Sequence, residues 1–308
     1  MKQGSESHED VVVKGIGAIR LVTLLVLLMS LLPIESWAAP IRGLSPRTTF
    51  VEGTALRTFG ELVHKENGSQ ELDIYRIPAI AQYQIMPDAT LAVAVPYVEK
   101  RLKVTSGGTT SVRSTHGLGD VRVTGKYRFW HKDEPFGVTQ AAVFGGLEVP
   151  TGSDSERDNV GALLPISLQL GSGSVDPFFG VALGRTGRTH SLEGGAQYQV
   201  NTKGEEFELG DTVRYDLTYQ YQIFPPQIEN SQLNLTVELN GKHVEKHELA
   251  GRKVENSGGD TIFVAPGLQF LINTVVVEGS VQLPIVQELN GTQPETDYSV
   301  LFGLRYLF

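Results

Sequence analysis

Apolar and polar residues alternate one by one along much of the chain after Phe50, which is the pattern of β-strands with two unlike faces. The clearest examples are the segments 121–129, 213–223 and 231–240. In the last of these, one face would carry Leu233, Leu235, Val237 and Leu239. No stretch of comparable length has apolar residues at helical spacing. The pattern therefore predicts an all-β protein.

Thirteen strands are expected in all, most of them 11 to 16 residues long. The other ten are 50–63, 71–85, 89–103, 137–150, 160–171, 175–186, 189–200, 260–272, 275–288 and 297–308. Strands of five or six residues are usual in soluble proteins, whereas a tilted strand that crosses a bilayer needs roughly 9–11 residues. Tight connections at 86–88 and 273–274 contrast with longer ones at 104–116, 151–159 and 246–259. Short turns at one end and long loops at the other are typical of outer-membrane barrels.

The expected architecture is a transmembrane, antiparallel, up-and-down β-barrel that covers residues 50–308 as one domain. Bacterial single-chain barrels have an even number of strands. The alternation of up and down strands breaks in the middle of the chain, so one of 160–171, 175–186 and 189–200 is misassigned or a strand is missing. We therefore predict twelve strands, with fourteen as the alternative. Residues 39–49 are expected to form an exposed N-terminal leader.

Residues 1–38 have the features of a secretory signal peptide. A run of twelve uncharged residues, 21–32, is shorter than the ~20 residues that a transmembrane helix needs. Basic residues precede the run, and Ser36-Trp37-Ala38 follows with small residues at both positions that cleavage requires. We expect cleavage after Ala38, Sec-type export and a location in the bacterial outer membrane.

The C-terminal segment 298–308 is an alternating strand that ends on an aromatic residue. Gly303, Tyr306 and Phe308 are similar to the assembly signal of bacterial outer-membrane proteins, although Leu301 stands where a polar residue is usual. An unpaired last strand can dock on the exposed edge of an assembly machine by β-strand addition. The expected partners are therefore the barrel assembly machinery and outer-membrane lipid.

In a membrane barrel the apolar faces contact lipid and the polar faces line the lumen, because unpaired polar groups in hydrocarbon would cost several kcal/mol. Strand parity places the following charged residues in the lumen: Arg122, Lys126, Arg128, Glu148, Glu193, Arg214, Asp216, Glu238, Glu278 and Arg305. Five are basic and five are acidic, which argues against a strongly ion-selective pore. The balance favours a salt-bridged interior with a narrow path for a small solute.

The basic residues of the segment 121–129 lie on one face, at Arg122, Lys126 and Arg128, with Glu148 expected as their nearest acidic partner. Like charges at this spacing repel each other, most strongly in a narrow, poorly solvated lumen. Two interpretations remain open. The residues form either an internal ion-pair ladder or a wall that attracts carboxylates and phenolates.

Composition excludes several other functions. The chain has 26 Lys+Arg against 35 Asp+Glu, a formal charge of −9, which does not suit a nucleic-acid binder. It has no cysteine, so disulfides, zinc-thiolate sites and cysteine nucleophiles are excluded. His243 and His247 lie too far apart for a shared ion if they stand on or beside a strand. Neighbouring Ser and His at 189–191 would point to opposite faces. We therefore expect no metal, no cofactor and no catalytic residues.

Several turn motifs carry a resemblance to a known family. Gly117-Leu118-Gly119-Asp120 precedes the strand 121–129, and residues 146–152 read GLEVPTG. With Asp176-Pro177-Phe178 and residues 290–297, they resemble the outer-membrane barrel family named after the meta-pathway of phenol degradation. The resemblance covers most of 50–308, and it implies a non-catalytic channel or transporter for small, aromatic or otherwise hydrophobic solutes. Two alternatives stay open: a structural outer-membrane barrel with a plugged lumen, and a soluble secreted β-sandwich or lipocalin-like binder.

Overall fold

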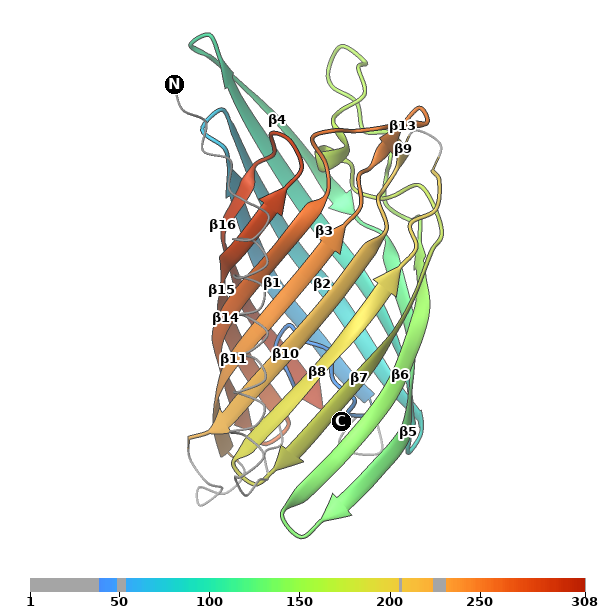
Figure 1. Ribbon diagram of the computed structural model, residues 1–308, viewed down its shortest axis with the longest axis vertical. Coiled ribbons are helices and arrows are strands. Elements are labelled where there is room, and N and C mark those ends of the chain that lie inside the picture. The colour runs from blue at the N-terminus through green and yellow to red at the C-terminus, as the bar shows by residue number, and fades with distance from the viewer. Residues whose placement is uncertain (1–38, 49–53, 205–206, 224–230, 308) are drawn as a thin grey trace, which may run out of the picture.

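The computed structural model describes residues 39–48, 54–204, 207–223 and 231–307. Its strands form an antiparallel sheet that closes into a barrel (Figure 1), because β1 (Thr54–Glu66) pairs with β2 (Gln70–Met86) on one side and with β16 (Glu295–Leu307) on the other. The other wall strands are β3 (Ala89–Ser106), β4 (Thr109–Leu118), β5 (Val121–Glu134), β6 (Gly137–Val149), β7 (Asp176–Gly187), β8 (His190–Gln199), β10 (Thr212–Gln222), β11 (Ser231–Val244), β14 (Gly259–Ile272) and β15 (Val275–Leu289). Three short strands in the loops, β9 (Phe207–Glu208), β12 (Glu248–Leu249) and β13 (Arg252–Lys253), form a separate small sheet.

The barrel has twelve strand positions, as predicted. The strands β4 and β5 share one position, because both run antiparallel to β3 along the same edge of it. Residues 97–106 of β3 pair with β4, and residues 89–94 pair with β5. The break between the two strands falls at Gly119 and Asp120.

Two predictions about individual segments are wrong. Residues 160–171 do not form a strand but a loop that contains one 3₁₀ turn, η1 (Ile166–Leu168). The apolar residues of this loop pack inside the barrel, so their spacing does not follow a two-sided strand. The segment 104–116 was expected to be a loop, but most of it belongs to β4, whose polar and exposed residues show no apolar face. No helix in the described ranges is long and apolar enough to cross a membrane.

The strands carry their apolar side chains outside and their polar side chains inside. In β11, Asn234 and Glu238 are completely buried, whereas Leu235 and Val237 are 41% and 39% exposed. A soluble sandwich or a lipocalin-like binder would have the opposite arrangement, because its apolar residues must leave water. That alternative is therefore wrong, and the predicted faces of this strand are confirmed.

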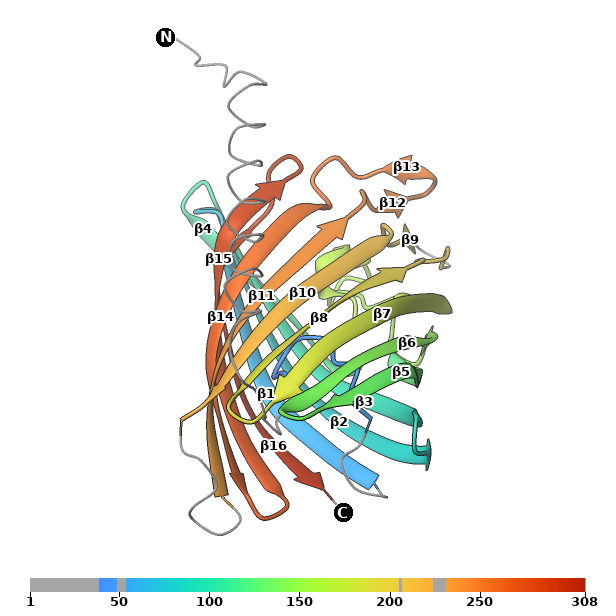
Figure 2. The ribbon, with the colours of Figure 1, turned by 60° about the horizontal axis from the view of Figure 1, so that its bottom comes forward.

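The two ends of the barrel differ in the length of their connections. At the short-turn end, the wall strands are joined by tight turns such as 87–88, 135–136 and 273–274. At the opposite, long-loop end, the connections include 150–175, 200–211 and 245–258. The strand β16 ends beside the short turn 273–274, and the small sheet of β9, β12 and β13 lies at the opposite, long-loop end (Figure 2).

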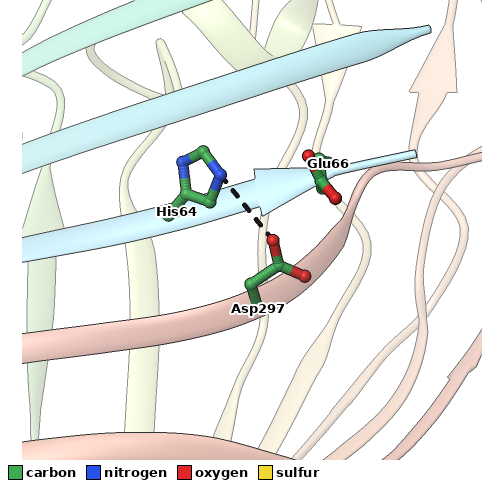
Figure 3. A group of neighbouring side chains, drawn as sticks. All are labelled: His64, Glu66 and Asp297. Carbon is green, nitrogen blue, oxygen red and sulfur yellow. Dashed lines mark ion pairs between the residues drawn. The ribbon is translucent and has the colours of Figure 1, made fainter. Parts of the chain in front are cut away.

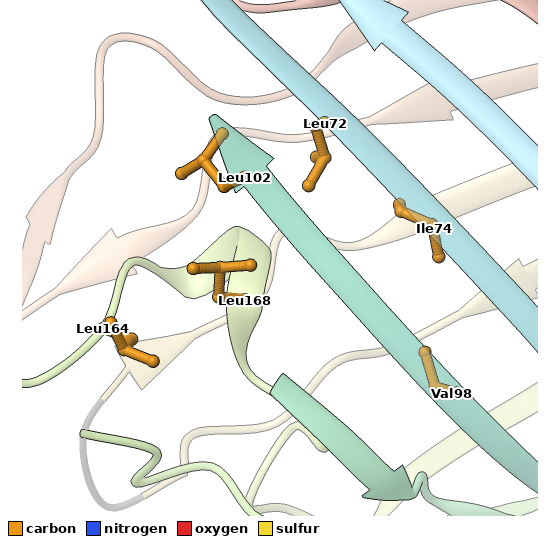
Figure 4. Close-up of a cluster of buried hydrophobic side chains, with 6 residues drawn as sticks. All are labelled: Leu72, Ile74, Val98, Leu102, Leu164 and Leu168. Carbon is orange, nitrogen blue, oxygen red and sulfur yellow. The ribbon is translucent and has the colours of Figure 1, made fainter. Parts of the chain in front are cut away.

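The loop 150–175 folds against the inner wall near the long-loop end. Leu164 and Leu168 pack there on inward-facing residues of β2 and β3 (Figure 4), which are Leu72, Ile74, Val98 and Leu102. The turn motifs hold the base of this loop, since the Asp120 carboxylate accepts hydrogen bonds from the amides of Gly152 at 2.9 Å and Ser172 at 2.6 Å. The loop therefore narrows the opening of the barrel at the long-loop end from the inside.

Residues 39–48, here called the luminal segment, lie inside the barrel (Figure 2). Ile41 is 1% exposed and Arg47 is 6% exposed, so the prediction of an exposed leader is wrong. The segment stays inside the barrel because it forms hydrogen bonds and ion pairs with charged residues of the wall. The predicted signal peptide and the terminal Phe308 of the predicted assembly signal lie outside the described residues.

Candidate functional site: the barrel lumen

Glu238 on β11 holds the start of the luminal segment. Its carboxylate accepts hydrogen bonds from the backbone amides of Ile41 at 2.7 Å, Arg42 at 3.0 Å and Gly43 at 3.1 Å. Hydrogen bonds to a charged acceptor are shorter and stronger than neutral ones. A side chain at position 43 would come within 2.6 Å of oxygens of Asp216 and of the neighbouring Thr218 on β10, so these side chains would have to move to make room for it.

Glu193 on β8 and Lys126 on β5 hold the other end of the segment. Arg47 forms a buried ion pair with Glu193, and the Ser45 hydroxyl donates to the same carboxylate at 2.5 Å. The Lys126 ammonium donates to the carbonyl oxygens of Ser45 and Arg47, each at 2.9 Å. The luminal segment therefore supplies polar partners for both charged side chains of the wall, Glu193 and Lys126.

Glu278 on β15 lies at the centre of a further set of ion pairs. Arg57 on β1 approaches it at 2.6 Å and Arg305 on β16 at 3.0 Å. Arg305 also donates to the carbonyl oxygen of Pro40 at 3.3 Å, which ties this group to the luminal segment. A buried carboxylate needs such partners, because an unpaired one would cost several kcal/mol.

The ten charged residues predicted to line the lumen thus occupy three levels. Six of them surround the luminal segment: Lys126, Glu193, Asp216, Glu238, Glu278 and Arg305. Arg128 lies near the short-turn end, where its guanidinium pairs with Asp88 at 2.6 Å. Arg122, Glu148 and Arg214 lie nearer the long-loop end. A role of these residues in transport stays a prediction.

Arg122 makes the contact that was expected of it and several more. It approaches Glu148 at 3.4 Å, donates to Gln197 at 2.7 Å, and lies over the Phe178 ring at 3.6 Å from its centroid. The basic residues of β5 therefore do not form one continuous ladder with Glu148. Each finds a different partner: Arg122 a carboxylate and amides, Lys126 two carbonyl groups, and Arg128 the carboxylate of Asp88.

Two cavities follow each other along the lumen. The mouth cavity, of about 960 Å³, lies at the long-loop end and is lined in part by Lys65, Lys100 and the loop 150–175. The central cavity, of about 610 Å³, lies beside the luminal segment. Six residues line both cavities and mark their junction: Phe59, Glu61, Arg76, Ile80, Arg122 and Arg214. The lumen therefore offers space on both sides of a ring that contains three arginines.

Several residues of the lumen were missed by sequence reasoning. They are Arg42, Arg47, Arg57, Glu61, Lys65, Arg76, Lys100 and Lys242. Arg57, Glu61 and Lys65 are four residues apart along β1, so they share one face, and strand parity could have identified them. Arg42 and Arg47 carried no such signal, because the luminal segment is not a strand.

Histidine and carboxylate side chains gather at the rim of the long-loop end, on the face of β1 opposite to Lys65. His64 Nδ1 lies 2.7 Å from Asp73, and Nε2 lies 3.7 Å from Asp297 (Figure 3). The geometry of His64, Glu66 and Asp297, or of His64, Glu71 and Asp73, could hold a metal ion. Most of these groups have partners within the protein: His64 pairs with Asp73 and stacks on Tyr298 with the ring centroids 5.4 Å apart, and Glu71 pairs with Lys103.

The histidines considered from the sequence have separate partners. His243 pairs with Asp260 at 2.8 Å, whereas His247 accepts a hydrogen bond from the amide of Gly210 at 2.9 Å. Near residues 189–191, His190 contacts the Tyr219 hydroxyl, and Ser191 donates to Gln220 on the buried face. These side chains are therefore not arranged as a nucleophile and its base.

A solved structure and a protein family are similar to this chain. The COG4313 outer membrane channel from Pseudomonas putida F1 superposes with a TM-score of 0.62, at 14% identity, over 88% of this chain and 100% of that chain. The beta domain of the Bordetella autotransporter BrkA gives a TM-score of 0.47 at 11% identity, over 83% of this chain and 99% of that one. The search of curated proteins found no match. The family model described as "Putative MetA-pathway of phenol degradation" matches residues 57–287, and the chain therefore belongs to that family.

Proposed function

We propose that this protein is a channel of the bacterial outer membrane that passes small solutes and catalyses no reaction. The observation that carries the proposal is a closed barrel with an apolar outer face whose polar lumen contains two cavities in succession. A lipid-exposed sheet must close, because open edges would leave backbone groups unpaired in hydrocarbon. The long-loop end would face the outside and the short-turn end the periplasm, as in outer-membrane barrels generally.

The proposal includes a delivery route. Sec-type export of a precursor with the signal peptide 1–38 would bring the chain to the periplasm. The barrel assembly machinery would then insert it into outer-membrane lipid, with Gly303, Tyr306 and Phe308 as the assembly signal. Cell fractionation tests this route: the full-length protein should require detergent for extraction, and deletion of Phe308 should leave unassembled protein in the periplasm.

The luminal segment would set the width of the channel. It is anchored by Glu238 at one end and by Glu193 at the other, so it occupies a fixed position beside the central cavity. A solute that leaves the mouth cavity must therefore pass the segment before it reaches the short-turn end. This arrangement favours a narrow path over a wide, water-filled pore.

Conductance in planar bilayers tests the proposal. The wild-type protein should form small, discrete conductance steps. The variant with both Glu193→Gln and Glu238→Gln should give larger steps, because neutral amides hold the luminal segment less tightly. Glu71→Gln is the matched control, since Glu71 pairs with the exposed Lys103 at the rim and does not contact the segment. Absence of current from both wild type and double variant would favour the alternative, a structural barrel with a plugged lumen.

A further inference from the structure

We infer that the mouth cavity is a binding site for small organic anions with an apolar body, of which aromatic carboxylates are the simplest examples. The inference rests on the proposed channel function and adds the class of solute that the channel would select. It stands on three observations: a pair of like charges placed opposite each other, an excess of cations over carboxylates in the cavity, and an apolar surface in the same cavity.

Arg214 on β10 and Lys242 on β11 are directly opposite each other in the ladder between these strands. Like charges at opposite positions of an antiparallel pair repel each other and destabilise the sheet. Among the described residues, neither side chain has an ion pair or a hydrogen bond. An anion held between the two groups would remove the repulsion, and a sequence that retains such a conflict usually does so at a functional site.

Other cations reinforce this pair. Lys242 is close enough to Lys65 and Arg76 to be repelled by both. The carboxylate that attracts it, Glu148, already pairs with Arg122. Five basic residues, including Arg214, and three acidic residues line the mouth cavity, and Lys242 lies next to this lining, opposite Arg214 on the neighbouring strand.

The carboxylates of the cavity have other partners. Glu61 pairs with Arg42 and Arg76, and Asp120 accepts hydrogen bonds from the loop 150–175. Burial and the nearby Lys242 lower the pKa of His247, which disfavours its charged form. The cation excess is therefore not neutralised by groups of the cavity itself.

The local charge is opposite to that of the whole chain, which carries −9. A cleft lined by one sign of charge between low-dielectric walls concentrates ions of the other sign. Two cations from neighbouring strands can also donate several charge-assisted hydrogen bonds to one carboxylate, and a guanidinium can do so with two parallel bonds. The pair formed by Arg214 and Lys242 thus suits a carboxylate better than a spherical ion.

An apolar surface lines the same cavity. It comes from Ile80 on β2, Ala94 and Pro96 on β3, and Leu170 in the loop 150–175. Ligand sites commonly combine such a surface with a few polar groups that fix orientation. A ring or short alkyl group could rest on this wall while its carboxylate meets the cations. This requirement distinguishes the proposed solute from inorganic anions.

Calorimetric titration of the full-length protein in detergent micelles tests the site independently of transport. The probes are benzoate, benzamide, which has the same ring without the charge, and acetate, which has the charge without the ring. Benzoate should bind about tenfold more tightly than either other probe, since each lacks one of the two interactions. If benzamide binds as well as benzoate, the cations do not recognise the ligand. If acetate binds as well, the apolar wall is not used. Either result overturns the inference.

The double variant Arg214→Gln with Lys242→Gln should weaken benzoate binding at least about tenfold, because both donors of the proposed carboxylate contact lose their charge. The matched control is Arg101→Gln with Lys103→Gln, which removes the same charge from the exposed outer face of β3 and should bind benzoate like the wild type. Equal loss in both double variants, or in neither, would contradict the site. Heat-modifiable gel mobility verifies folding, and Lys65→Gln replaces the double variant if that one does not fold.

The two proposals fail differently. A protein that conducts ions in bilayers but does not bind benzoate would leave the channel intact and refute the anion site. A protein that binds benzoate with the expected preference but carries no current would refute the channel and retain the site.

Discussion

The lumen has two regions, one near the luminal segment and one near the long-loop end. They differ in how their inward-facing charged side chains are stabilised. Around the segment, Glu193 and Glu238 meet basic side chains or backbone amides supplied by the chain itself. At the mouth, Arg214 and Lys242 face each other without a partner among the described residues. Both regions are polar and inward-facing. They differ in whether the protein supplies its own counter-charges.

Solvation explains why both arrangements are possible. A buried charge needs a partner, because removal from water costs several kcal/mol. Glu193 is 2% exposed, and its partner Arg47 is 6% exposed, so this pair has no access to water. Arg214, in contrast, is exposed to the space of the lumen, where water can solvate it until an anion arrives. Paired charges fix the segment, and solvated charges remain available for a solute.

The largest expected effect concerns the fixed region. Glu238→Gln replaces an acceptor of three backbone amides, so local opening of the luminal segment should become easier by about 3 kcal/mol, roughly 100-fold in equilibrium. Hydrogen exchange at the amides of Ile41, Arg42 and Gly43 measures this opening. Unchanged protection at these amides would show that Glu238 does not hold the segment.

Gly43→Ala should have a smaller effect in the same region. Its new methyl group would meet Asp216 and Thr218 oxygens at 2.6 Å, and such overpacking costs about 1–3 kcal/mol. Hydrogen exchange of the segment should therefore accelerate, though less than in Glu238→Gln. Gly60→Ala on β1 is the matched control, because nothing lies within 4 Å of a methyl group added there, and it should leave the segment protected. Normal exchange in Gly43→Ala would mean that the segment does not pack closely against Asp216 and Thr218.

The sequence predicted the wall of the barrel better than its contents. Alternation in segments such as 231–240 depends on neighbouring residues, and it assigned the outer and inner faces of β11 correctly. The segment 160–171 failed because its apolar residues pack on the inner wall, so their spacing reflects a tertiary contact. The luminal segment failed for a related reason: Ile41 and Glu238, which bond to each other, are 197 residues apart.

The candidate site was predicted only in part. Strand parity found Arg122, Glu148 and Arg214, but the equal number of acidic and basic residues suggested a lumen without ion preference. The equal numbers hide an uneven distribution of the two charges along the lumen. Glu193 and Glu238 bind the luminal segment and do not reach the mouth cavity. Only the three-dimensional arrangement shows which charges remain available to a solute.

The smallest expected effect on stability concerns the mouth. Lys242→Gln removes one member of a repelling pair, so the barrel should become more stable by about 0.5 kcal/mol or stay unchanged. Urea unfolding in detergent micelles measures the difference. A loss of more than about 1 kcal/mol would indicate that Lys242 has a stabilising partner, and would make it resemble the charges around the luminal segment.

The reversal potential of the reconstituted channel under a potassium chloride gradient tests the difference between the two regions most directly. The wild-type protein should prefer chloride over potassium, although the chain carries −9, because the solvated cations of the mouth govern entry. The variant with Arg214→Gln and Lys242→Gln should lose that preference, whereas Arg101→Gln with Lys103→Gln should keep it. A wild-type channel that prefers potassium, or a preference that survives in the mouth variant, would contradict the account.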